Sequence, residues 1–151
     1  TLPHLYNIIK SKTSKWVTPT LISKDIDQSE TLFNDVFISV TCSGTASLEI
    51  AKRNIPQIVI YKLNYFTELI LKLIIKIKKA CILNIVSNKT IIPEVVNSQL
   101  NKRNIINNFD KLLNDSDYRN KQINDINKNL PLIENDESPY DISISRILSL
   151  I

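Results

Sequence analysis

The stretch from Thr41 to Glu49 holds the residues whose types and spacing could do chemistry, and it contains the only glycine of the chain. Ser43 and Thr45 flank Gly44, so two hydroxyls and the neighbouring backbone amides are available to an anion. An apolar run precedes the stretch and a helix-forming run follows it, which places the glycine at a strand-to-helix junction. Free amides at the start of a helix favour phosphate or diphosphate.

Glu49 follows Thr45 by four residues, so its carboxylate lies one turn further along the same helix face. A carboxylate suits the paired hydroxyls of a ribose, and this spacing therefore agrees with a nucleotide site. The same residues also have a purely structural explanation, because serine and threonine commonly cap helices and glycine commonly occupies turns. The local pattern leaves both explanations open. It matches neither the Walker A loop nor the GxGxxG and GxSxG motifs.

Strands that alternate with helices form the expected framework. The pattern predicts strands at 16–22, 36–40, 57–61 and 80–86, and helices at 5–12, 30–34, 48–53, 65–79, 101–114, 117–129 and 140–151. The unbroken apolar run at 57–61 is typical of a strand buried on both faces of a parallel sheet, and after Pro93 we expect only helices. The expected fold class is α/β, a Rossmann-like parallel sheet with crossover helices and a C-terminal helical tail. We expect residues 1–151 to form a single partial domain.

Composition limits the classes of protein to consider. The chain has 151 residues, 43% hydrophobic and 23% charged, which suffices for one globular domain with a core. The net charge of +4 comes from lysines that are not interleaved with aromatic residues, so we expect no nucleic-acid partner. Cys42 and Cys81 form no CxxC pair, and we expect two buried, reduced thiols in a cytoplasmic protein. We see no metal-ligand cluster and expect neither a metal nor a cofactor.

Several motifs occur along the chain in the order of a known family. They are Ser43–Glu49, Pro56–Lys62, Leu83–Ile85 and Pro93–Asn97. These resemble the SGTA-x-LE helix start, the P-x-V-V-x-Y-(K/R) strand, the L-P-N strand end and the P-E-L-L-Q helix of bacterial lipid-A-disaccharide synthase, in its C-terminal half. The family also has a basic amphipathic helix after the strand, where this chain has Tyr65–Lys79. The resemblance runs from residue 1 to about residue 114.

The resemblance implies a two-domain glycosyltransferase of the GT-B type. This chain would be the incomplete C-terminal half, and the N-terminal acceptor domain would be absent. Such an enzyme transfers 2,3-diacylglucosamine from its UDP conjugate to lipid X, which is 2,3-diacylglucosamine-1-phosphate. By this resemblance Ser43, Gly44 and Thr45 would hold the UDP diphosphate, Glu49 would bind the ribose, and Asn84 would be a further donor-site residue. No catalytic residue is expected here, since the family's proton-transfer groups belong to its N-terminal domain.

Three positions depart from the family pattern. Leu83 stands where the family usually has proline, Asn88-Lys89 replaces a common Gly-Arg pair, and Asn97 replaces the glutamine. The lost glycine raises the question of how the turn near residue 88 is formed.

Partners and location follow from the same resemblance. An enzyme with acylated substrates is expected in the cytoplasm, peripheral to the inner face of the inner membrane. Tyr65–Lys79, apolar on one face and cationic on the other, is a candidate membrane-surface contact, although a crossover helix explains the pattern as well. A homodimer or a separate N-terminal partner is left open. Two other functions are also left open: a non-catalytic remnant or split product, and another GT-B sugar-nucleotide enzyme such as an epimerase or hexosaminyltransferase.

Overall fold

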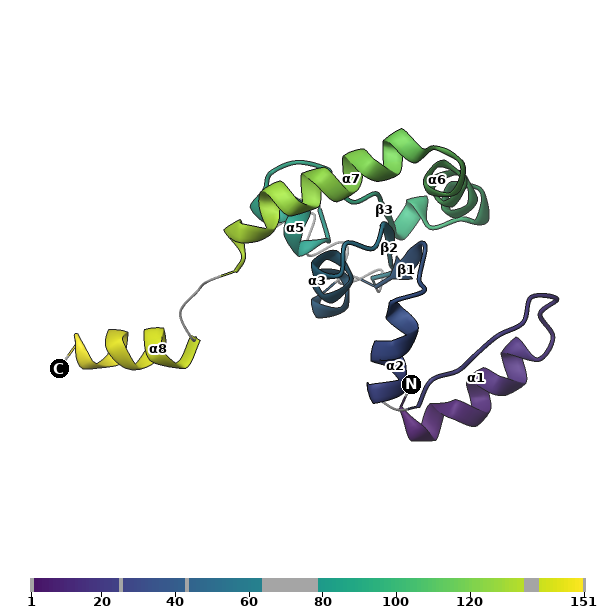
Figure 1. The fold of residues 1–151 in the computed structure, drawn as a ribbon, viewed down its shortest axis with the longest axis horizontal. Helices are drawn as coiled ribbons and strands as arrows, with labels where there is room; N and C mark the ends of the chain where they lie inside the picture. The colour runs from purple at the N-terminus through teal and green to yellow at the C-terminus, as the bar shows by residue number, and fades with distance from the viewer. Residues whose placement is uncertain (1, 25, 43, 64–78, 135–138, 151) are drawn as a thin grey trace. The chain divides into compact units, whose positions relative to one another are not determined.

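The computed structural model describes residues 2–24, 26–42, 44–63, 79–134 and 139–150 (Figure 1). The chain divides into two compact units, Thr1–Val36 (unit 1) and Phe37–Ile151 (unit 2), and each is described by itself. The expectation that the chain is a single partial domain stays a prediction.

Unit 1 consists of short helices. They are η1 (Pro3–Leu5), α1 (Tyr6–Thr13) and α2 (Ile26–Phe33). The helix expected at 5–12 is confirmed as α1. After α1 the chain returns toward its own start, and the Lys24 ammonium lies 3.6 Å from the centre of the Tyr6 ring. A cation over an aromatic face is attracted to the ring's negative charge, which ties the segment that follows α1 back to that helix.

The prediction of a strand at 16–22 is wrong, because these residues form no regular secondary structure. Pro19 has no amide hydrogen for a strand ladder. An isolated strand also gains no stability without a partner, and the described part of unit 1 contains no other strand.

Unit 2 is built on a parallel sheet of three strands in the order β1-β2-β3. The strands are β1 (Ser39–Thr41), β2 (Gln57–Tyr61) and β3 (Glu94–Val96). Ser39 lies beside Gln57, and Val59 lies beside Glu94. Ile58 and Val59 are fully buried, which confirms the prediction of a central strand in a parallel sheet. The strand expected at 36–40 is present but is shorter and ends at Thr41.

Helices lie between the strands in the chain and after the last of them. They are α3 (Thr45–Lys52), α5 (Ile82–Val86), α6 (Lys102–Asn114), α7 (Ser116–Asn129) and α8 (Pro139–Leu148), with the short turns η2 (Asn97–Gln99) and η3 (Leu130–Leu132). The expected helices at 48–53, 101–114, 117–129 and 140–151 are confirmed with slightly different ends. Asn101 and Asp115 fix the starts of α6 and α7, since each side chain accepts a backbone amide of the first turn at 2.9 Å. The helix expected at 65–79 lies outside the described residues except for Lys79.

Two expected elements are of the wrong type. Residues 80–86, expected as a strand, contain α5, and the Glu94 carboxylate accepts the amides of Ala80 (2.6 Å) and Cys81 (3.1 Å) just before that helix. Apolar runs of this length do not by themselves distinguish a strand from a helix. The segment after Pro93, expected to be helical, begins with β3, whose valines fit a pleated surface beside β2.

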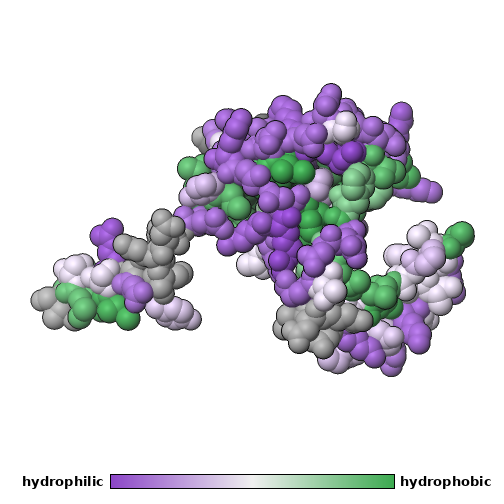
Figure 2. Space-filling model, viewed as in Figure 1, coloured by the Kyte–Doolittle hydropathy of each residue, from purple (hydrophilic) through white to green (hydrophobic). Residues whose placement is uncertain are grey.

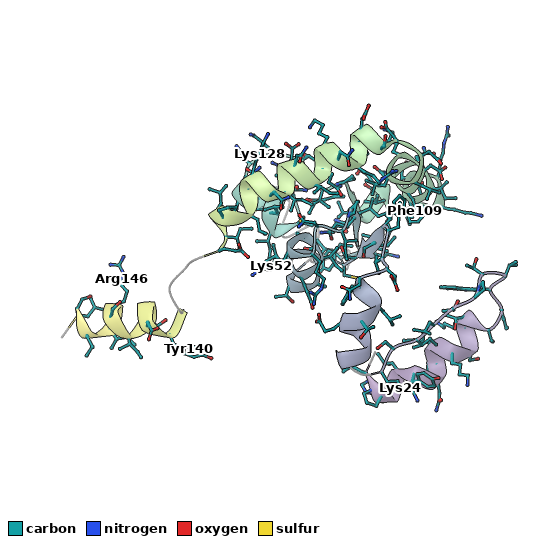
Figure 3. All side chains as sticks on the ribbon, viewed as in Figure 1. Lys24, Lys52, Phe109, Lys128, Tyr140 and Arg146 are labelled. Atoms are coloured by element: carbon teal, nitrogen blue, oxygen red, sulfur yellow. The ribbon has the colours of Figure 1, made fainter. Side chains whose placement is uncertain are left out.

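The core of unit 2 lies among β2, α3, α5 and α7. Figure 1 shows α7 running over α5 and the strands. The central buried cluster is Ala51, Val59, Cys81, Leu83, Ile91, Ile92, Ile126 and Leu130. The outward face of α7 is hydrophilic in Figure 2. At the surface Lys52, labelled in Figure 3, pairs with the Glu134 carboxylate at 2.8 Å and links the end of α3 to the segment after η3.

No helix in the described ranges is both long and apolar enough to cross a membrane.

Asparagine takes the left-handed backbone conformation at three described positions. Asn54, Asn88 and Asn97 have φ angles of 57°, 53° and 49°. Asparagine adopts this region more readily than other residues with a side chain. The turn at residue 88 is therefore formed with asparagine in the left-handed conformation.

Replacing Ile126 by alanine tests the assignment of the core. Ile126 is fully buried, so Ile126→Ala is expected to lower the free energy of unfolding by about 2–5 kcal/mol through lost burial and a residual cavity. Urea denaturation followed by circular dichroism measures the change. The control Ile106→Ala removes a side chain that is 44% exposed on α6 and is expected to cost less than about 1 kcal/mol. Equal losses in both variants would contradict the assignment.

Candidate functional site

Residues 42–45, named here the glycine turn, connect β1 to α3, and Ser43 among them lies outside the described residues. Gly44 has φ 114° and ψ −152°, a combination that is essentially restricted to glycine. A Cβ atom at this position would meet nothing within 4 Å. The backbone conformation, and not a close approach by another group, therefore explains why glycine is needed here.

The glycine turn lies at the carboxyl end of β1 and the amino end of α3. Gly44 is the N-cap residue of α3 and has no side chain with which to cap the amides of the first turn. Thr45 is the first helical residue and is exposed. The Ser47 hydroxyl donates to the Gly44 carbonyl at 2.7 Å, which fixes the turn from inside the helix. Parallel sheets bind ligands beyond the carboxyl ends of their strands, so the amino end of α3 and the exposed Thr45 occupy a suitable place.

Glu49 lies one turn beyond Thr45 on α3 and is exposed. One carboxylate oxygen is 3.3 Å from a guanidinium nitrogen of Arg53. Ion pairs between solvent-exposed side chains contribute little, because water and salt screen them. The carboxylate can therefore exchange this contact for the hydroxyls of a ligand.

Asn84 is fully buried in α5, and its amide is occupied within the chain. The nitrogen donates to the Ile92 carbonyl (2.7 Å) and to the Glu94 carboxylate (2.6 Å). The oxygen accepts the amides of Ile91 (2.8 Å) and Ile92 (3.0 Å). Asn84 thus holds the segment that leads into β3. Its expected contact with the donor substrate stays a prediction.

A buried contact joins the two parts of the candidate site. The Cys81 sulfur, at the N-cap of α5, lies 3.9 Å from the Ser47 hydroxyl oxygen on α3. The structure therefore places the start of α3, with Gly44 and Thr45, next to the start of α5, which carries Asn84.

The two cysteines differ in environment. Both thiols are free and Cys81 is buried as expected, but the expectation that Cys42 is buried is wrong. Cys42 directly follows β1 at the carboxyl edge of the sheet, where its side chain is exposed.

The segments that leave β2 and β3 meet at the same carboxyl edge. The Asn97 side-chain oxygen accepts the amide of Leu63 at 2.9 Å. Leu63 follows β2 by two residues and Asn97 directly follows β3. This hydrogen bond ties the two segments together at the edge from which the glycine turn also leaves the sheet.

Sequence reasoning missed the side chains that support the site. Gln57 and Glu94 both bond across the fold, and neither was selected as a candidate. Gln57 is the one polar residue in the apolar run at 55–60, which is a usable signal because buried polar groups require partners. Glu94 gave a weaker signal, since an acid after a proline also fits the first turn of a helix.

Parallel strands joined by helices, with a glycine turn at the carboxyl edge, place this chain among Rossmann-like α/β proteins. Within that class the chain belongs to the lipid-A-disaccharide synthetase family, whose model matches residues 4–147. The match confirms the resemblance drawn from the ordered motifs.

Individual relatives carry the same name. Lipid-A-disaccharide synthase of Rickettsia bellii is 38% identical over 91 residues, that of Gluconobacter oxydans 28% over 120, and that of Bradyrhizobium diazoefficiens 25% over 124. These alignments cover 60%, 80% and 82% of this chain but only 24%, 29% and 31% of the relatives. The chain therefore spans about a quarter to a third of the length of the curated relatives it matches.

Replacing Gly44 by alanine tests the backbone of the glycine turn. Gly44→Ala is expected to lower the free energy of unfolding by about 1–3 kcal/mol, because a residue with a Cβ is strained at these backbone angles. Thermal and urea unfolding measure the loss. Ala46→Gly, inside the same helix, is the matched control and is expected to cost about 1 kcal/mol or less. An unchanged stability of Gly44→Ala would show that the turn accepts another conformation.

Replacing Asn84 by aspartate tests the buried amide. Asn84→Asp puts a carboxylate oxygen in place of the donor that contacts the Ile92 carbonyl and the Glu94 carboxylate. Lost hydrogen bonds and repulsion are expected to lower the free energy of unfolding at neutral pH by about 1–3 kcal/mol or more. Asn120→Asp, an exposed change on α7, is the control with an expected effect within about 0.5 kcal/mol. Similar unfolding midpoints for both variants would refute the role assigned to the amide.

Proposed function

We propose that this chain supplies the UDP-binding part of a glycosyltransferase of lipid A biosynthesis. In this proposal 2,3-diacylglucosamine is transferred from its UDP conjugate to lipid X. The observation that carries the proposal is the position of the motif Gly44–Glu49, at the carboxyl end of β1 and the start of α3, in a chain of the lipid-A-disaccharide synthetase family.

The glycine turn would bind the diphosphate of UDP. The amides at the start of α3 and the hydroxyls of Ser43 and Thr45 are donors, and the helix dipole adds roughly half a positive charge at this end. Negative charge develops on the diphosphate as UDP leaves the sugar. Donors that are already fixed stabilise this charge without reorganising, which lowers the barrier to transfer.

Glu49 and Asn84 would complete the donor site in different ways. The exposed Glu49 carboxylate, one turn from Thr45, would accept hydrogen bonds from the ribose hydroxyls. Asn84 would act chiefly by holding the segment at 91–92 and Glu94, because its own amide is occupied.

The acceptor site and the groups that transfer protons would belong to a part of the relatives that this chain does not span. The chain alone would then bind UDP without catalysing transfer. We further propose a cytoplasmic enzyme peripheral to the inner face of the inner membrane. Tyr65–Lys79 would contact the membrane surface. Of these residues the structure describes only Lys79.

Titration with UDP tests the proposed function. Calorimetric titration of the wild-type chain is expected to detect binding, and Ser43→Ala, Thr45→Ala and Glu49→Ala are each expected to weaken it roughly tenfold or more, as a lost hydrogen bond to a charged group would. Thr90→Ala and Glu134→Ala remove an exposed hydroxyl and an exposed carboxylate elsewhere and should leave the affinity unchanged. Absence of UDP binding by a folded wild-type chain would favour a non-catalytic remnant. Equal affinity in all variants would reject the site.

A further inference from the structure

Gln57 connects the two ends of the glycine turn through its buried side chain. Its amide oxygen accepts the Thr41 hydroxyl at 2.7 Å, and its amide nitrogen donates to the Ser47 carbonyl at 2.8 Å. Thr41 is the last residue of β1, and Ser47 lies in the first turn of α3. All three side chains are buried. One amide group therefore sets the separation between the strand that enters the turn and the helix that leaves it.

The backbone of Gln57 is itself held in place from α7. Its amide donates to the Gln122 side-chain oxygen at 2.8 Å, and its carbonyl accepts the Gln122 side-chain nitrogen at 3.0 Å. Gln57 lies two residues before Val59, the first residue of β2 that pairs with β3. Because β3 pairs with β2 only from Val59 onward, the Gln122 side chain provides the donor and the acceptor for the backbone of Gln57. The backbone from which the Gln57 side chain extends is therefore held in place.

The Gln57 bridge meets a need of diphosphate binding. Donors recognise an anion strongly only when they converge on it, so the position of the α3 amides relative to β1 matters to a fraction of an ångström. The strand and the helix are joined by a turn that contains the residue with the least restricted backbone, Gly44. The side-chain amide of Gln57 restrains the two ends of this turn. Both of its described contacts lie within the protein.

We propose that Gln57 is a positioning residue, which holds the glycine turn in the geometry that binds the diphosphate of a nucleotide sugar. This inference rests on the proposed function. The Gln57 amide does not itself contact the ligand. It acts through Thr41 and Ser47, so its removal should affect recognition of the diphosphate and leave recognition of the nucleoside intact.

The variant Gln57→Met and the comparison variant Gln122→Met test this role. Methionine keeps most of the volume of glutamine but forms none of its hydrogen bonds. Each substitution removes two side-chain hydrogen bonds from a buried residue, and only Gln57 bridges the turn. Titration with UDP reports recognition of the diphosphate together with the nucleoside, and titration with uridine reports recognition of the nucleoside alone. Thermal unfolding measures the change in general stability.

We expect Gln57→Met to bind UDP roughly tenfold more weakly than wild type and uridine with unchanged affinity. We expect Gln122→Met, which frees the Gln57 backbone but leaves the side-chain bridge of Gln57 in place, to weaken UDP binding less than Gln57→Met does, although its unfolding temperature falls to a similar extent. Thr41→Val, which removes one end of the bridge and keeps the shape of the side chain, should weaken UDP binding to a smaller degree. This second variant also serves if Gln57→Met does not fold.

Three results would overturn the inference. Wild-type UDP affinity in a folded Gln57→Met, or in Thr41→Val where Gln57→Met does not fold, would show that the bridge does not position the turn. Equal loss of UDP and uridine binding in both methionine variants would show a structural role alone. If the wild-type chain itself does not bind UDP, the proposed function fails, and the role of Gln57 in diphosphate binding fails with it.

Discussion

The pair of hydrogen bonds between the Gln122 side chain and the backbone of Gln57 is the interaction on which the rest of unit 2 depends. The strands are only three, five and three residues long, so the sheet does not reach far enough to position the helices. A side-chain amide offers the same donor and acceptor as a peptide group. Gln122 therefore acts as a one-residue extension of the sheet, and it joins α7 to a strand that is 65 residues away in sequence.

The same solution recurs on the other side of the fold. Asn84 bonds the backbone at 91–92, and Glu94 bonds the backbone at the start of α5. In both places a polar side chain replaces secondary structure that is too short to satisfy the backbone. Leaving such a buried group without a partner costs about 1–3 kcal/mol, so each lost member lowers the stability of the arrangement. The buried contact of Ser47 with Cys81 joins these two networks beneath the start of α3.

Local patterns predicted what depends on local interactions. Helices α6 and α7 have their capping residues in sequence, and β2 has its apolar run, so their positions could be predicted. The glycine turn was also predictable, because Gly44, Thr45 and Glu49 lie on one strand-to-helix connection. Helix α5 and strand β3 were not, since the carboxylate that binds the amides just before α5 comes from β3, and β3 in turn depends on pairing with β2. Gln57 was missed for the same reason, because its partners lie 10, 16 and 65 residues away.

The distribution of asparagine and glycine has an evolutionary consequence. Asparagine is abundant here, and at Asn54 and Asn88 it occupies left-handed turn positions that glycine would also fit. Codons for asparagine are rich in adenine and thymine and those for glycine in guanine, so mutation pressure toward adenine and thymine would exchange one for the other wherever the backbone permits. The angles of Gly44 lie outside the left-handed region that asparagine tolerates. Gly44 is thus the position at which replacement by asparagine would strain the backbone.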